Sequence, residues 1–178
     1  MSKIYKQWYT KQIDENKKSS LQLISGGDME QINYEKICSF YVSKSHLIVI
    51  LLQYLKEKLK KDIELTVLTE DDFYLEIQKI INKTEIESNI KNKIEKEFRK
   101  KINKKAIKKI KGIVIVQGDY EYIKKVNIKL EKNKKIEIIN CFKFEDFETK
   151  TNEILRSHYK ILNTLGEKEI SNLLSRRI

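Results

Sequence analysis

Short apolar runs alternate along this 178-residue chain with longer segments whose apolar residues recur at helical spacing. The runs are rich in β-branched residues, which favour strands. The run from Gly112 to Val116 is unbroken, as is typical of a parallel strand buried on both faces. We therefore expect four strands, over residues 37–42, 63–68, 112–116 and 136–142.

Two helices are expected in the first half of the chain. Ser43 is a suitable N-cap for the first, whose apolar residues from Leu47 to Leu59 follow a 3.6-residue period. Thr69 and Asp72 form a capping pattern for the second, because the acid falls three residues after the threonine. We expect this second helix to end near Ile81.

The last third of the chain is expected to contain two helices and a tail. One helix covers residues 120–131, directly after the third strand. The last helix begins at Asp146 or Thr149 and continues to Gly166, which ends it. A short helical tail is expected over residues 166–178.

A lysine-rich helical insert is expected over residues 85–111. Its apolar residues from Ile86 to Ile110 recur at intervals of four. On a straight helix such a stripe would turn by about 40° at each step, since successive residues are separated by about 100°. We therefore expect two helical pieces with a break near Asn103.

Strands that alternate with helices predict an α/β fold with a mostly parallel sheet and helices on both faces. Five Gly and no Pro are too few turn residues for a β-sandwich, and nine Tyr and six Phe argue against disorder. We expect an N-terminal arm over 1–33, an α/β domain over 34–165 and the tail over 166–178. In such sheets ligands bind outside the carboxyl ends of the strands.

The net charge of +11 is concentrated in one segment. Residues 91–111 hold eleven Lys or Arg and two Glu, a local charge of +9. The first interpretation is a solvated helix face in a chain rich in lysine throughout. The second is a surface that binds the phosphate backbone of nucleic acid. Its binding residues would be Lys100, Lys101, Lys104, Lys105 and Lys108.

Motifs for nucleotide, metal and catalytic chemistry are missing from the sequence. Neither G-x-x-x-x-G-K-[ST] nor G-x-G-x-x-G occurs, and two His with two widely separated Cys do not form a metal-binding pattern. We therefore expect no cofactor, no metal and no enzymatic activity. The longest apolar run, residues 47–52, is too short to span a bilayer, and the N-terminus is polar. We expect a cytoplasmic protein without a membrane span.

Several short blocks occur in the order and spacing of a known family. Residues 34–41 read YEKICSFY where that family typically has H-I-C-x-F-Y, and residues 54–59 read YLKEKL where it has P-Y-L-K-E-G-L. Residues 118–122 read GDYEY in place of G-E-M-x-W. The family's C-x-Y-D corresponds to CFKF at residues 141–144, and its [IL]-L-R-T-H-P corresponds to ILRSHY at residues 154–159. The chain thus resembles the MEDS family of sensory domains, named for methanogens and methylotrophs.

The sequence departs from this family at informative positions. Lys36 replaces the family's first-block His, Asp119 replaces its Glu, and Tyr122 aligns with its Trp. Lys143-Phe144 replaces the Tyr-Asp pair that follows the second Cys. If the family's His and Glu belong to a ligand site, that site is altered or lost here.

The resemblance implies a RecA/KaiC-like sheet without a phosphate loop, used as a stand-alone sensor in signal transduction or transcriptional control. The implied partners are a regulatory protein (a kinase or transcription factor), a small-molecule ligand and a second copy of the chain. The ligand site expected at the strand ends and the last helix comprises Lys36, Cys38, Phe40, Gly118, Asp119, Tyr122, Cys141, Arg156 and His158.

Two other functions stay open at this point. The first is a regulator that binds nucleic acid through the lysine-rich insert. The second is a nuclease or phosphohydrolase that uses Asp119, Arg156 and His158. The sensory domain is the leading hypothesis because only it accounts for the ordered blocks.

Overall fold

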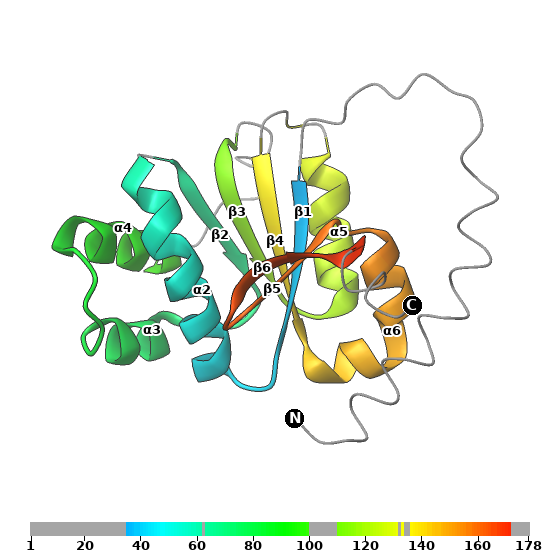
Figure 1. Ribbon diagram of the computed structural model, residues 1–178, viewed down its shortest axis with the longest axis horizontal. Helices are drawn as coiled ribbons and strands as arrows, with labels where there is room; N and C mark the ends of the chain where they lie inside the picture. The colour runs from blue at the N-terminus through cyan, green and yellow to red at the C-terminus, as the bar shows by residue number, and fades with distance from the viewer. Residues whose placement is uncertain (1–34, 62, 100–109, 132, 134–135, 172–178) are drawn as a thin grey trace. The chain divides into compact units, whose positions relative to one another are not determined.

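A six-stranded sheet with the strand order β2-β3-β4-β1-β5-β6 organises the chain (Figure 1). The computed structural model describes residues 35–61, 63–99, 110–131, 133 and 136–171. Strands β1 to β5 run parallel, and β6 pairs antiparallel with β5. The expected mostly parallel sheet is confirmed. The strands are β1 (Glu35–Tyr41), β2 (Leu65–Thr69), β3 (Gly112–Gln117), β4 (Ile136–Lys143), β5 (Lys160–Asn163) and β6 (Gly166–Glu169).

Helices cover both faces of the sheet, as expected (Figure 1). One face carries α2 (Lys44–Lys58), α3 (Tyr74–Ile81) and α4 (Ser88–Arg99). The other face carries α5 (Tyr120–Leu130) and α6 (Phe144–Arg156). A short 3-10 helix, Leu59–Lys61, continues α2. None of the described helices is both long enough and apolar enough to cross a membrane.

Helix α2 is apolar around most of its circumference because it packs against the sheet on one side and α3 on the other. The Ser43 hydroxyl accepts a hydrogen bond from the amide of His46 (3.2 Å), which confirms Ser43 as the N-cap. Leu47, Ile48 and Leu51 are buried with the sheet residues Ile37 and Ile115 in one cluster. Burial of each such side chain contributes about 1.5–3 kcal/mol.

The capping pattern predicted for the second helix is wrong. Thr69 is the last residue of β2, where it pairs with Gln117 of β3, and its hydroxyl donates to the carbonyl of Asp71 (2.7 Å). Helix α3 begins only at Tyr74, whose amide donates to the Asp72 carboxylate (2.9 Å). Strand pairing therefore takes precedence over the local capping signal. The end of this helix at Ile81 is confirmed.

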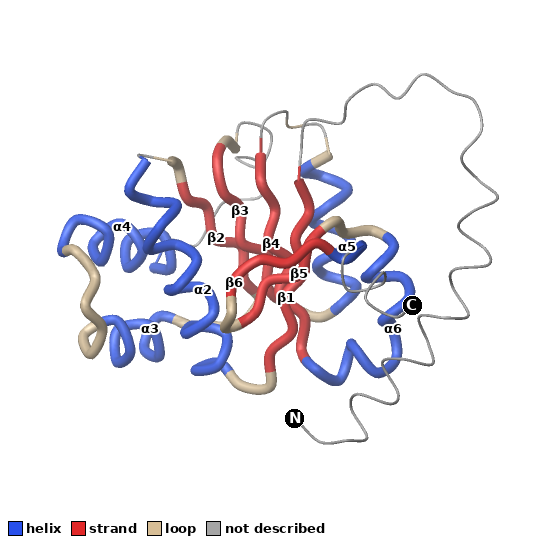
Figure 2. The backbone as a smooth tube through the Cα atoms, viewed as in Figure 1, coloured by secondary structure: helices blue, strands red, loops and turns tan. Residues whose placement is uncertain are grey.

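The secondary structure predicted after residue 143 is also wrong. Helix α6 begins at Phe144, earlier than Asp146 or Thr149, and ends at Arg156. The segment that follows is the β5–β6 hairpin, which replaces the expected end of the last helix and the start of the tail (Figure 2). Its first strand pairs with β1, where Ser39 lies opposite Leu162. Parallel pairing with the edge of β1 that β4 does not occupy thus makes residues 160–163 a strand.

Several predictions fall outside the described residues. These are the N-terminal arm over 1–33, the break near Asn103, the tail beyond residue 171, and the five lysines at 100, 101, 104, 105 and 108. Within the lysine-rich insert, the first helical piece is confirmed as α4.

Candidate functional site

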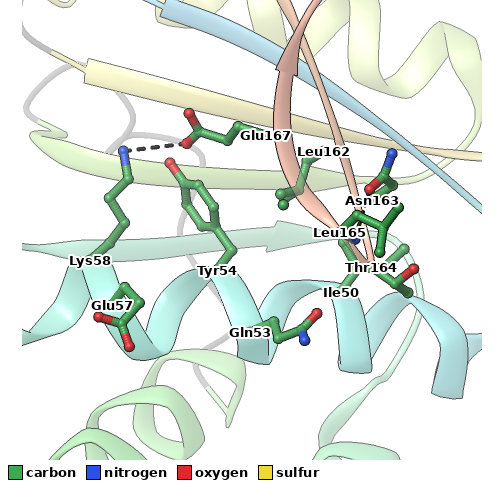
Figure 3. Close-up of a pocket in the computed structure, with 11 residues that line it drawn as sticks. Ile50, Gln53, Tyr54, Glu57, Lys58, Leu162, Asn163, Thr164, Leu165 and Glu167 are labelled. Atoms are coloured by element: carbon green, nitrogen blue, oxygen red, sulfur yellow. Dashed lines mark hydrogen bonds and ion pairs between the residues drawn. The ribbon is translucent and has the colours of Figure 1, made fainter.

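A groove of about 630 Å³ lies between α2 and the β5–β6 hairpin (Figure 3). This volume is within the range of sites that hold small molecules, about 300–1,000 Å³. Helix α2 contributes Ile50, Gln53, Tyr54, Glu57 and Lys58, and residues 162–167 line it from the hairpin.

The hairpin turn shapes one wall of the groove. Thr164 and Leu165 connect the two strands, and the Asn163 side chain accepts a hydrogen bond from the amide of Leu165 (2.8 Å). Gly166 then adopts a φ of 94°, a left-handed conformation that favours glycine. Leu165 is left 79% exposed at the turn, although it is a large apolar side chain.

A polar cluster forms the other end of the groove, which we call the charged end. The Tyr54 hydroxyl donates to the Glu137 carboxylate of β4. The Lys58 ammonium donates to the other oxygen of Glu137 (3.0 Å) and forms an ion pair with Glu167 of β6 (3.4 Å) (Figure 3). Glu167 also pairs with Lys160 of β5 (3.3 Å). The cluster therefore joins α2, the centre of the sheet and the hairpin.

Burial and neighbouring charges perturb this cluster. Burial raises the pKa of Tyr54, and its hydrogen bond to Glu137 raises that pKa further, so Tyr54 remains a proton donor. Burial opposes the charge of Lys58, but Glu137 and Glu167 raise its pKa overall. Burial likewise opposes the charge of Glu167, but Lys58 and other partners lower its pKa overall. The ion pairs are therefore maintained at neutral pH.

Lys160 extends the cluster toward the edge of the sheet. Its ammonium pairs with Glu35 and Glu167, and more distantly with Glu169 (3.9 Å). The hydrogen bond to Glu35 raises the pKa of Lys160 to about 12, although burial opposes this. We call the complete set the groove network: Lys58 and Lys160 with Glu35, Glu137, Glu167 and Glu169.

The nine predicted ligand residues do not meet at one place, and none of them lines the groove. One group lies toward the amino end of β1. There Lys36 pairs with Glu131 (3.5 Å), and its carbonyl accepts from the amide of Tyr159, close to His158 and the end of α6 at Arg156.

His158 is held inside the domain. Its Nδ1 donates to the carbonyl of Ile154 (2.6 Å), and its Nε2 accepts from the amide of Asn140 (2.8 Å). Burial lowers the pKa of His158 to about 4, although the bond to Ile154 opposes this. The neutral ring therefore serves as a buried link between α6 and β4.

A second group lies at the carboxyl end of β3. After Gly118, the Asp119 amide donates to the Glu70 carboxylate (2.8 Å), and the Asp119 side chain caps α5 by accepting from the amide of Tyr122 (2.7 Å). Helix α6 has 13 residues, so about 20 Å separates its start at this edge from Arg156. The three residues of the nuclease hypothesis, Asp119, Arg156 and His158, are thus not brought together.

A third group lies inside the sheet. Cys38 and Cys141 are both buried on adjacent strands but face opposite sides of it, because Cys141 shares the α2 side with Tyr41. Burial raises the pKa of Cys38 to about 12 and also raises that of Cys141. Phe40 stacks on Phe142, with ring centroids 5.8 Å apart. The two cysteines pack the interior, and Phe40 is half-buried against Phe142.

The carboxyl edge of the sheet is closed by hydrogen bonds among its own residues. Gln117 is buried, and its amide donates to the Tyr41 hydroxyl (2.7 Å) and the Asp71 carboxylate (3.2 Å). Two residues, Val42 and Ser43, connect β1 to α2. A loop of this length cannot wrap a phosphate as the eight-residue phosphate-loop motif does. In the described chain, no group of three or more His, Cys, Asp or Glu is arranged to hold a metal ion.

Sequence reasoning missed the residues that line the groove. Tyr54 and Lys58 stand in the YLKEKL block, four residues apart on one helix face, but neither is among the predicted site residues. Their spacing shows only that the two side chains are neighbours on the helix. Glu167 lies in the hairpin, a segment for which the sequence predicts a helix end and a tail.

Comparisons with protein-family models, with curated proteins and with solved structures found no match to this chain. The likeness to the MEDS family therefore stays an interpretation of the blocks quoted above.

Proposed function

We propose that this protein is a non-enzymatic sensory or regulatory domain that binds a small molecule in the groove between α2 and the β5–β6 hairpin. The observation that supports this proposal most strongly is that the groove lies between a helix packed in the core and a hairpin at the edge of the sheet. Helix α2 is embedded in the core, whereas β6 forms one edge of the sheet and pairs with β5. A ligand held by both would favour one position of the hairpin.

The signal would then pass to another protein through the hairpin. The partner class that we propose is a kinase or a transcription factor, as the resemblance to a sensory family implies. A bound ligand would change the surface that Thr164 and Leu165 present to a partner protein, because both residues line the groove and lie at the tip of the hairpin.

Two tryptophan variants on the same helix test the site. Gln53→Trp places a bulky ring in the groove, whereas Val49→Trp adds the same ring at a position of α2 that is 45% exposed and does not line the groove. Ligand-observed NMR with a library of small aromatic fragments should detect binders of the unmodified protein. We expect Gln53→Trp to lose them and Val49→Trp to keep them. Equal behaviour of the two variants would contradict the proposed site.

No specific observation favours nucleic acid as the ligand. Helix α4 has a formal charge of only +2, because its four basic residues are accompanied by Glu95 and Glu97; the basic residues are Lys91, Lys93, Lys96 and Arg99. The Arg99 guanidinium lies over the ring of Tyr74 (4.7 Å), where it packs on α3.

A further inference from the structure

The groove network holds more carboxylates than cations. Two ammonium groups face four carboxylates, which leaves a formal charge of −2. This excess stands out in a chain whose net charge is +11. At the rim, Glu57 adds another carboxylate, which is 68% exposed and pairs with Lys60 (3.3 Å).

One oxygen of the network lacks a hydrogen-bond donor. Glu167 Oε1 is buried and accepts no hydrogen bond from the described residues, and its ion pair with Lys58 is long at 3.4 Å. A buried carboxylate oxygen whose nearest cation is at this distance is incompletely satisfied, so a ligand N–H group that reached it would be favoured. The Lys58 ammonium lies closer to Glu137 (3.0 Å) than to Glu167 (3.4 Å).

The opposite end of the groove is apolar. Ile50 and Leu162 are almost completely buried beneath it, while Leu165 is 79% exposed at its edge. The ring of Tyr54 lies between this apolar end and the charged end (Figure 3). A molecule that covers Leu165 would remove its apolar surface from water.

We propose that the groove binds an amphipathic organic amine, with its ammonium group beside Glu167 and its aromatic or aliphatic body against Ile50, Leu162 and Leu165. An anionic ligand would instead compete with Glu137 and Glu167 for Lys58 and would meet the Glu57 carboxylate at the rim. This inference rests on the proposed function, because it names the ligand class of the same groove.

Three probes of one shape and different charge test the inference. Tryptamine, tryptophol and indole-3-propionate share an indole ring and a two-carbon chain, which ends in an ammonium, a hydroxyl and a carboxylate. Isothermal titration calorimetry of the full chain at neutral pH should give the tightest binding for tryptamine, about tenfold tighter than for indole-3-propionate, with tryptophol between them. Added salt should reduce this preference, since it screens charges at the rim.

Charge variants locate the ammonium group. Glu167→Gln should abolish the preference of tryptamine over tryptophol while tryptophol still binds. Glu57→Gln, on the exposed rim, should reduce the preference without disturbing the fold, and it keeps the test decisive if Glu167→Gln does not fold. Glu153→Gln on α6, a carboxylate that is 56% exposed and remote from the groove lining, is the matched control and should change nothing.

The outcomes separate this inference from the proposed function. Equal affinities for the three probes, or tighter binding of indole-3-propionate, would overturn the amine assignment and leave the groove as a ligand site. Failure of all three to bind would also overturn it, and the Gln53→Trp fragment comparison would then decide whether the proposed function fails with it.

Discussion

The Tyr54 hydroxyl donates a hydrogen bond to the Glu137 carboxylate, across 83 residues of sequence, and so fastens helix α2 to strand β4. Tyr54 is 7% exposed, which makes this bond part of the domain interior rather than a surface contact. The same carboxylate receives Lys58, so one strand residue anchors two helix residues. Glu137 of β4 therefore holds both helix residues of the charged end in place.

Tyr54→Phe should destabilise the fold because it removes a donor from a largely buried carboxylate. We expect a loss of about 1–3 kcal/mol in the free energy of unfolding, measured by urea denaturation. Tyr120→Phe is the matched control, since Tyr120 bonds to Glu153 at the surface (2.6 Å), and it should cost less than about 1 kcal/mol. Equal losses for the two variants would contradict the role given to Tyr54.

Lys58→Met should loosen the β5–β6 hairpin, because it leaves Glu137 and Glu167 without their shared ammonium. Hydrogen–deuterium exchange of the amides in β6 should accelerate by about fivefold or more, the factor that corresponds to about 1 kcal/mol. Lys56→Met removes an exposed lysine from the same helix and should leave exchange unchanged. Unchanged exchange in Lys58→Met would show that the ion pairs do not hold the hairpin.

His158 should make stability fall in mildly acidic solution. Its pKa in the folded protein is about 4, below the ordinary value of about 6.5, so the unfolded chain binds the additional proton between these values. The free energy of unfolding should therefore decrease by up to about 3 kcal/mol as the pH falls from about 6.5 to about 4, and this contribution should be constant above pH 7. Urea denaturation at several pH values measures it.

The variant His158→Gln should remove most of that pH dependence, and His46→Gln, which replaces the other histidine, is the matched control. Denaturation curves of the two variants at pH 5 and pH 7 give the comparison. An undiminished slope in His158→Gln would mean that other groups cause the acid sensitivity.

Two glycines with positive φ should respond differently to alanine. A Cβ at Gly112 would lie 2.3 Å from the carbonyl oxygen of Glu64, on the backbone beside β2, whereas a Cβ at Gly166 meets nothing within 4 Å. Gly166→Ala should cost only the strain of a left-handed residue, about 1–2 kcal/mol. Gly112→Ala should cost clearly more, because the backbone must move as well. Similar melting temperatures for both variants would contradict this packing.

Exchange of Lys100, Lys101, Lys104 and Lys105 for Glu separates the proposed function from the nucleic-acid hypothesis. We expect the tagged variant to recover the same protein partner as the unmodified chain from a nuclease-treated extract of its native cells. Loss of all recovered material in the variant, together with nucleic acid as the only material bound by the unmodified chain, would favour the basic insert as the binding surface.

Local signals in the sequence predict much of the sheet and most helices. Ser43, the stripe of α2 and the unbroken run from Gly112 act within a few residues of one another, so sequence reasoning reaches them. The conformation of residues 160–169 depends instead on pairing with β1, more than a hundred residues earlier, as in the pair of Cys38 with Ile161. Leu162 fits a helical spacing as well as a strand, and only the free edge of β1 decides between them.

The groove escapes prediction for the same reason. Tyr54 and Lys58 come from one helix, but their partners Glu137 and Glu167 come from β4 and β6. The residues of the expected site are instead chosen from the blocks that resemble the MEDS family. Gly118 and Asp119 do stand at a carboxyl strand end, whereas Lys36 and His158 stand toward the other edge.

The central claim, that the groove between α2 and the hairpin binds small molecules, is tested most directly by mapping a bound probe. Methyl-labelled Ile and Leu residues of the full chain should be followed by NMR during titration with tryptophol, which carries no charge. We predict saturable chemical-shift changes that are largest at Leu165, Ile50 and Leu162. Changes that are largest at Ile123 or Ile154, on the opposite face of the sheet, would contradict the account.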